Sequence, residues 1–151
     1  MAIWDTSNEI TKGWSYEMNL IAHYDPEIDA ISLHYGQPTR GGYEVAENWS
    51  IILHVLEDKS RGAAELEVIG VSAWLPLGKR SYCRETDTLT FGGNVEAATV
   101  IAENGDLVAY WGPDQYDPDY LVPIAVDLRN ASKHLAPVLE AQSQLSNVAS
   151  G

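Results

Sequence analysis

Four carboxylates and one histidine are the side chains best suited to move a proton. Asp29 and Asp87 occupy matching places in two similar stretches of sequence, and so do Glu67 and Asp127. Two symmetry-related carboxylates in one enclosed site would supply a general acid and a general base, because burial and like charge push their pKa values apart. His54 lies within an apolar run and is the best candidate for a proton carrier. The predicted catalytic residues are Asp29, Glu67, Asp127 and His54.

Each of these side chains also has a plain structural interpretation. Glu67 and Asp127 stand between apolar neighbours, so strand alternation places them on the face opposite the core, where solvent reaches them. Asp29 and Asp87 can cap the entrances of strands. A lone histidine within a strand is usually a hydrogen-bonded structural group. The sequence leaves both interpretations open for every one of these residues.

Tryptophan and tyrosine are strongly favoured over phenylalanine, with 5 Trp and 8 Tyr against 1 Phe. Both combine a large apolar face with a polar tip, which suits the wall of a partly hydrated pocket or an interface. We therefore predict substrate-binding roles for Tyr16, Trp49, Trp74 and Trp111. The alternative for any single one of them is a place in a small β core.

No motif predicts a metal or an organic cofactor. The single cysteine, Cys83, excludes an internal disulfide and an all-cysteine metal site, and it lacks a nearby histidine to activate it. The 4 histidines show no metal-ligand spacing such as His-x-x-x-His, and phosphate-binding loops and dinucleotide fingerprints are missing. Asp114, Asp117 and Asp119 are interpreted as a solvated turn, because their spacing does not fit a calcium loop.

The charge of the chain restricts its partners. Among 151 residues, 9 are Lys or Arg and 22 are Asp or Glu, which gives a net charge of −13. Nucleic acid and anionic membrane surfaces are therefore excluded as partners, because both require a basic footprint. Residues 1–8 do not resemble a signal peptide, and no window has the length of a membrane span. These features predict a cytoplasmic protein.

Two motifs occur twice in the same order. The pattern Tyr-x-x-Glu-x-Asp, followed by alternating apolar residues, begins at Tyr24 and again 58 residues later at Tyr82. A second motif at 66–72 matches 126–132 at an offset of 60. This order and spacing predict an internal duplication. The predicted organisation is a single domain, residues 1–151, with repeat one over about 24–77 and repeat two over about 82–137.

The repeated motifs resemble those of a short bacterial β-rich domain family of unknown function. Its pattern opens with Tyr-Asp-x-Glu-x-Asp-Ala, which Tyr24–Leu33 matches, and closes with Asn-Ala-Ser before a helix, which Val126–Lys133 matches. The other ends depart from it, since Cys83-Arg84 replaces Asp-Pro and Gly70-Val71 replaces Asn-Ala. The resemblance implies a fold and no particular activity.

Hydrophobic periodicity predicts mainly strands. The expected strands cover 14–22, 31–35, 47–56, 64–72, 87–91, 95–102, 107–111 and 121–128. An Asn-Gly pair within 103–106 predicts a β-hairpin, and only about 130–145 is expected to be helical, with Pro137 near a helix start. The fold class is all-β with a C-terminal helix: an antiparallel β-barrel or sandwich of about eight strands built from two pseudo-symmetric repeats. Loops at 37–43 and 112–120 are expected to cover the barrel mouth as lids.

Two classes of function fit these features. The first is a cofactor-independent cyclase or isomerase, in which an aromatic-lined barrel binds one small apolar or polyol substrate and carboxylates provide acid–base catalysis. In size and composition the chain is similar to small cofactor-free β-barrel cyclases of bacterial polyketide biosynthesis, which implies spiroacetal or related ring formation. The alternative is an acidic, antitoxin-like protein that neutralises a basic protein partner. A homodimer with aromatic residues at its interface is a third interpretation.

Overall fold

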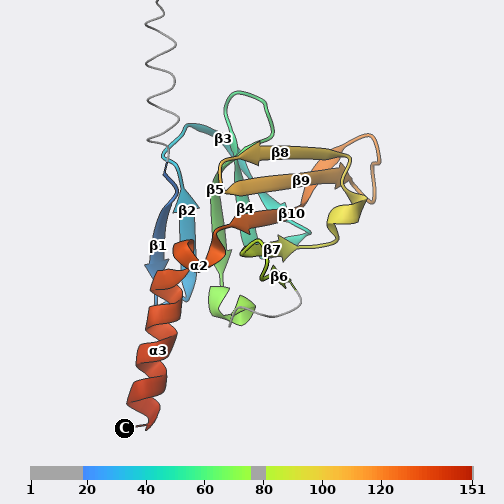
Figure 1. Ribbon diagram of the computed structural model, residues 1–151. Coiled ribbons are helices and arrows are strands. Elements are labelled where there is room, and N and C mark those ends of the chain that lie inside the picture. The colour runs from blue at the N-terminus through green and yellow to red at the C-terminus, as the bar shows by residue number, and fades with distance from the viewer. Residues whose placement is uncertain (1–18, 76–80, 151) are drawn as a thin grey trace, which may run out of the picture.

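The computed structural model describes residues 19–75 and 81–150, which form ten strands in two antiparallel sheets (Figure 1). The first sheet contains β1 (Ile21–Asp25), β2 (Ala30–His34), β3 (Thr39–Val45), β4 (Asn48–Leu56) and β5 (Ala63–Ile69). The second contains β6 (Tyr82–Cys83), β7 (Thr88–Gly92), β8 (Val100–Asn104), β9 (Leu107–Pro113) and β10 (Leu121–Arg129). The prediction of an all-β fold with a C-terminal helix is confirmed.

The two sheets have the same strand order. It is β1-β2-β5-β4-β3 in the first sheet and β6-β7-β10-β9-β8 in the second, so the repeated sequence folds into a repeated topology. The strands of the second sheet run across those of the first (Figure 1). Each sheet keeps its own edge strands over the described residues, and the molecule is a sandwich. The barrel alternative is therefore wrong.

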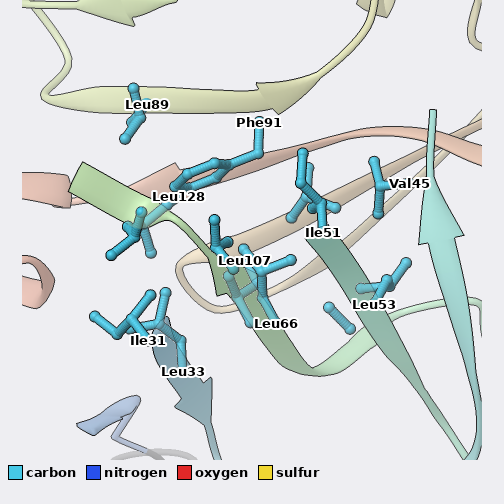
Figure 2. Packing of buried hydrophobic residues seen from close by; sticks show 14 of the residues in the cluster. Ile31, Leu33, Val45, Ile51, Leu53, Leu66, Leu89, Phe91, Leu107 and Leu128 are labelled. Atoms are coloured by element: carbon cyan, nitrogen blue, oxygen red, sulfur yellow. The ribbon is translucent and has the colours of Figure 1, made fainter. Parts of the chain in front are cut away.

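Strand alternation builds the core between the sheets. In β5, Leu66 and Val68 are fully buried, and in β10 Val126 and Leu128 take the corresponding places. Figure 2 shows side chains from both sheets meeting in one apolar cluster. Its labelled members are Ile31, Leu33, Val45, Ile51, Leu53 and Leu66 from the first sheet and Leu89, Phe91, Leu107 and Leu128 from the second. The space between the sheets is thus filled by apolar side chains.

One side chain of the first repeat enters the β8–β9 hairpin of the second. The Tyr35 hydroxyl donates to the Asn104 carbonyl and accepts from the Asp106 N–H, each at 2.8 Å. Gly105 has a φ of +59°, and a Cβ there would lie 2.4 Å from the Tyr35 hydroxyl oxygen. Backbone conformation and space therefore both require glycine. The predicted Asn-Gly hairpin is confirmed.

One short helix lies between the two sheets, a second lies within the second sheet, and two helices follow β10. They are the 3-10 helices η1 (Val71–Trp74) and η2 (Val95–Ala97) and the α-helices α2 (Ala131–His134) and α3 (Ala136–Ser150). His134 is buried, and its Nε2 lies 2.7 Å from Oδ2 of Asp106, which attaches α2 to the β8–β9 hairpin. No described helix combines the length and apolar character needed to cross a bilayer.

Two predicted elements differ from the structure, and a third lies mostly outside the described residues. Most of the expected lid at 37–43 belongs to the edge strand β3, where pairing with β4 outweighs the weak strand propensity of Gly41 and Gly42. The expected strand at 95–102 begins as η2, because the Asn94 side chain accepts from the Glu96 N–H and caps a 3-10 turn. The expected strand at 14–22 lies mostly outside the described residues, and β1 begins at Ile21.

Candidate functional site

Asp29 fastens the β1–β2 hairpin to the end of β5. Its Oδ1 accepts from the Tyr24 hydroxyl at 2.7 Å, and its Oδ2 accepts from the Ser72 hydroxyl at 2.5 Å. Its carbonyl accepts from the backbone N–H groups of Gly70 and Val71. Asp29 has a φ of 52°, a left-handed conformation that aspartate tolerates better than most residues. The side chain and backbone of Asp29 thus hold three segments together.

Asp87 makes the same arrangement in the second repeat. It accepts from the Tyr82 hydroxyl at 2.7 Å and from the Ser132 hydroxyl at 2.6 Å, and its carbonyl accepts from the Ala131 N–H. Partial burial opposes ionisation, but the hydrogen bonds from Ser132 and Tyr82 outweigh it and hold the pKa of Asp87 below its usual value. In both repeats the Tyr-x-x-x-x-Asp spacing thus allows a tyrosine and a distant serine to donate to one aspartate at the turn of a β-hairpin. We call this arrangement the hairpin lock, and it agrees with the structural interpretation of these two acids.

Glu67 and His54 meet on the outer face of the first sheet. His54 Nε2 lies 2.5 Å from Glu67 Oε1, and the side chains are 26% and 47% exposed. Glu65, two residues before Glu67 on β5, lies on the same face and accepts from the Ser32 hydroxyl at 2.8 Å. One ligand atom of each of His54, Glu65 and Glu67 lies within 4.8 Å of the others. We call these three side chains the His–Glu–Glu cluster.

Asp127 lies at the position of the second sheet that corresponds to Glu67. Strand register pairs Ser32 with Glu67 and Thr90 with Asp127. Asp127 accepts from the Thr90 hydroxyl through Oδ1 and from the Tyr110 hydroxyl through Oδ2, both at 2.6 Å. Burial and the adjacent Asp127 raise the pKa of Tyr110 to about 12. Neutral hydroxyl groups therefore engage both oxygens of this carboxylate.

The predicted aromatic residues do not share one environment. Trp111 is buried, donates from Nε1 to the Arg61 carbonyl at 2.9 Å and contacts Tyr43 edge to face. Trp74 makes an edge contact with Phe91, with ring centroids 5.1 Å apart. Trp49 is 67% exposed on the surface, and Tyr16 lies outside the described residues. Trp111 and Trp74 thus contribute to the core, whereas Trp49 faces solvent.

An acidic groove runs along the junction of the two repeats. It has a volume of about 460 Å³, and its walls come from β3, the β3–β4 turn, the end of β9 and the start of β10. Among the described residues that line it, Glu44, Glu47 and Asp114 are charged, and Tyr43 and Pro123 contribute apolar surface. Gln115 donates to Glu47 at 2.8 Å and holds the groove walls together. We call this feature the junction groove.

The loop beside the groove is organised by its aspartates. The Asp114 carboxylate accepts from the backbone N–H groups of Tyr116 and Asp117, and Asp117 accepts from the N–H of Asp119. Such contacts are typical of Asx turns. Tyr116, at 82% exposed, projects from this loop into solvent.

The comparisons with protein-family models, with curated proteins and with solved structures find no match for this chain.

Of the four predicted catalytic residues, the structure brings His54 and Glu67 together and leaves Asp29 and Asp127 in separate hydrogen-bond networks. Glu65 was not among the predicted residues. Its signal in the sequence is the Glu-x-Glu spacing, which places both carboxylates on one face of a strand.

Proposed function

We propose that this protein binds a basic protein partner in the junction groove. The observation that carries the proposal is the lining of that groove, where three carboxylates lie beside apolar side chains. Lys and Arg side chains fit such a surface, because their aliphatic stems cover apolar area while the charged head reaches a carboxylate. The net charge of −13 adds long-range attraction for the same class of partner.

The packing of the molecule also supports a surface-binding function. Apolar side chains fill the interior between the sheets, and large exposed aromatic residues lie on the outside, with Tyr116 next to the groove. Exposed aromatic residues beside charged groups are typical anchors of protein interfaces. The antitoxin-like interpretation of the sequence therefore has more structural support than the enclosed-pocket one.

A variant that removes the groove charge tests this proposal. We expect E44Q/E47Q/D114N to bind a labelled peptide of alternating Lys and Leu about tenfold more weakly, or roughly 1.4 kcal/mol. Fluorescence anisotropy at low ionic strength measures the affinity. Binding should also weaken at about 1 M salt, where the Debye length is ~3 Å.

The matched control changes the net charge by the same amount away from the groove. E27Q/E57Q/E85Q neutralises three exposed glutamates in other loops and should retain most of the affinity. Equal loss in both triple variants would mean that only net charge matters and would contradict a groove site. Failure of the wild-type protein to bind the basic peptide would contradict the proposal altogether.

A second candidate is the cofactor-independent cyclase or isomerase, and one contact favours it. His54 Nε2 lies 2.5 Å from Glu67 Oε1, a distance at which a proton can pass between the two groups. If this pair catalyses ring closure, the protein should convert a linear dihydroxyketone to one stereoisomer of its spiroacetal with release of one water molecule, and H54Q should abolish that preference. Chiral chromatography measures the product, and a racemic product with the wild-type protein would exclude this candidate.

A further inference from the structure

We propose that His54, Glu65 and Glu67 bind a first-row divalent metal ion on the outer face of the first sheet, with Zn²⁺ as the best match. The proposal goes beyond binding of a basic partner, because the three residues of the cluster lie on β4 and β5 and none of them lines the junction groove.

The sheet itself positions the three donors. Glu65 and Glu67 flank the buried Leu66 on β5 and therefore point to the same outer face. His54 on β4 is in register with Glu65, which brings its ring over the same part of that face. One ligand atom from each side chain lies within 4.8 Å of the other two. Side-chain rotation would bring these atoms to the shorter separation that a shared ion requires.

The donor types are those of a zinc site. Zn²⁺ binds imidazole nitrogen and carboxylate oxygen at about 2.0–2.2 Å, commonly with three protein ligands and one water. Two carboxylates and one neutral imidazole leave a net negative charge that a divalent cation offsets. The partial exposure of His54 and Glu67 leaves room for water as the fourth ligand.

Two neighbouring residues support the cluster. Gly42 on β3 is in register with His54, and a Cβ there would lie 3.3 Å from Cε1 of the imidazole, so glycine makes room for the ring. The Ser32 hydroxyl donates to Oε2 of Glu65, which fixes that carboxylate and directs its other oxygen away from Ser32. Hydrogen bonds of this kind orient metal ligands and change metal affinity by about 10–100-fold.

The second repeat lacks these donors at the corresponding positions. Register pairs Ala125 with Tyr110 on the second sheet, where the first sheet pairs Glu65 with His54. Asp127, the counterpart of Glu67, already accepts two hydroxyl hydrogen bonds. The second repeat thus contains the same backbone arrangement with one carboxylate and no imidazole, and we assign the site to the first repeat alone.

Calorimetric titration of the full chain with ZnCl₂, after dialysis against a chelator, tests the site. We expect one Zn²⁺ per chain in the wild-type protein and a loss of affinity of more than about 100-fold in H54Q and in E67Q, which exceeds the effect of removing a hydrogen bond to a ligand. S32A should weaken binding less than either ligand variant, because Ser32 orients Glu65 without contacting the ion. Circular dichroism confirms that each variant is folded, and E65Q supplies the ligand test if H54Q is not.

The matched control is H34Q. His34 lies on the same outer face, in register with Glu65 from β2, but it is not part of the His–Glu–Glu cluster. We expect H34Q to bind Zn²⁺ as the wild-type protein does. The proposal is overturned if the wild-type protein binds no Zn²⁺, if H54Q binds it unchanged, or if H34Q loses as much affinity as H54Q.

Discussion

The two repeats share one hydrogen-bonded lock and differ in the polar cluster on the outer face of the sheet. In both, a tyrosine and a serine donate to one aspartate, Asp29 or Asp87, at the end of a β-hairpin. On the outer face, hydroxyl groups surround Asp127 in the second repeat, whereas the first repeat places an imidazole and two carboxylates together.

The shared lock serves the fold, whereas the differing side chains on the outer faces could serve a function. The lock connects the hairpin to the end of a strand that is distant in sequence, and both copies have it at the same place in the same strand order. The outer face is not part of the core, and substitutions there change chemistry without changing topology. Hydroxyl groups engage both oxygens of Asp127, whereas the His–Glu–Glu cluster places two carboxylates beside one imidazole.

Breaking the lock should give the largest effect on stability. We expect D29A to lower the free energy of unfolding by about 2–3 kcal/mol, because it removes hydrogen bonds to a charged group and leaves alanine in a left-handed conformation. D87A should lower the free energy of unfolding by less, because the contacts of Asp87 to Ser132 are more exposed than those of Asp29 to Ser72. Urea unfolding measures both, and D58A in an exposed turn is the control. A cost below about 0.5 kcal/mol for D29A would show that the lock is dispensable.

The outer faces should differ in their contribution to stability. Y110F removes a hydrogen bond to Asp127 and should lower the free energy of unfolding by about 1 kcal/mol. H54Q should lower the free energy of unfolding by less, because a partly exposed histidine–glutamate contact typically contributes only ~0–1 kcal/mol. Thermal and urea unfolding of the two variants provide the comparison. If H54Q costs more than Y110F, the His–Glu–Glu cluster is a structural network like its counterpart.

Tyr110 should report the Asp127 network through its titration. Burial, and then Asp127, raise its pKa to about 12, so its contribution to stability is complete below pH about 10 and is lost as the pH rises toward 12. In D127N the pKa should fall but remain above 10, because burial persists. Titration by ¹³C NMR of the tyrosine ring measures this shift. Burial and Asp29 raise the pKa of Tyr24 to about 12, and this pKa should be the same in D127N as in the wild-type protein.

The repeated fold was predictable because its signals are local. The alternation around Leu66 and Val68, the Asn-Gly hairpin and the recurring Tyr-to-Asp spacing lie within short windows of sequence. The sequence did not predict edge strand β3, because Gly41 and Gly42 interrupt the alternation of apolar and polar residues. Pairing with β4 stabilises this strand. The choice between a barrel and a sandwich depends on how two sheets pack, which no local pattern specifies.

The His–Glu–Glu cluster could be predicted only in part. His54 and Glu67 were singled out separately, but their contact depends on the register between β4 and β5. The register between these strands shifts at a β-bulge between His54 and Val55. No local sequence pattern predicts the position of this bulge. Glu65 becomes relevant only once His54 is known to lie opposite it. The structural interpretation of Asp29 and Asp87, by contrast, followed from their position at strand entrances.

The most direct test exchanges the outer face of the first repeat for that of the second. The variant H54Y/E65A gives β4 and β5 the side chains that Tyr110 and Ala125 provide in the second sheet, and it should remain folded. Zn²⁺ titration followed by calorimetry should show one site in the wild-type protein and none in this variant. Unchanged Zn²⁺ binding by folded H54Y/E65A would contradict the claim that the His–Glu–Glu cluster is the metal site.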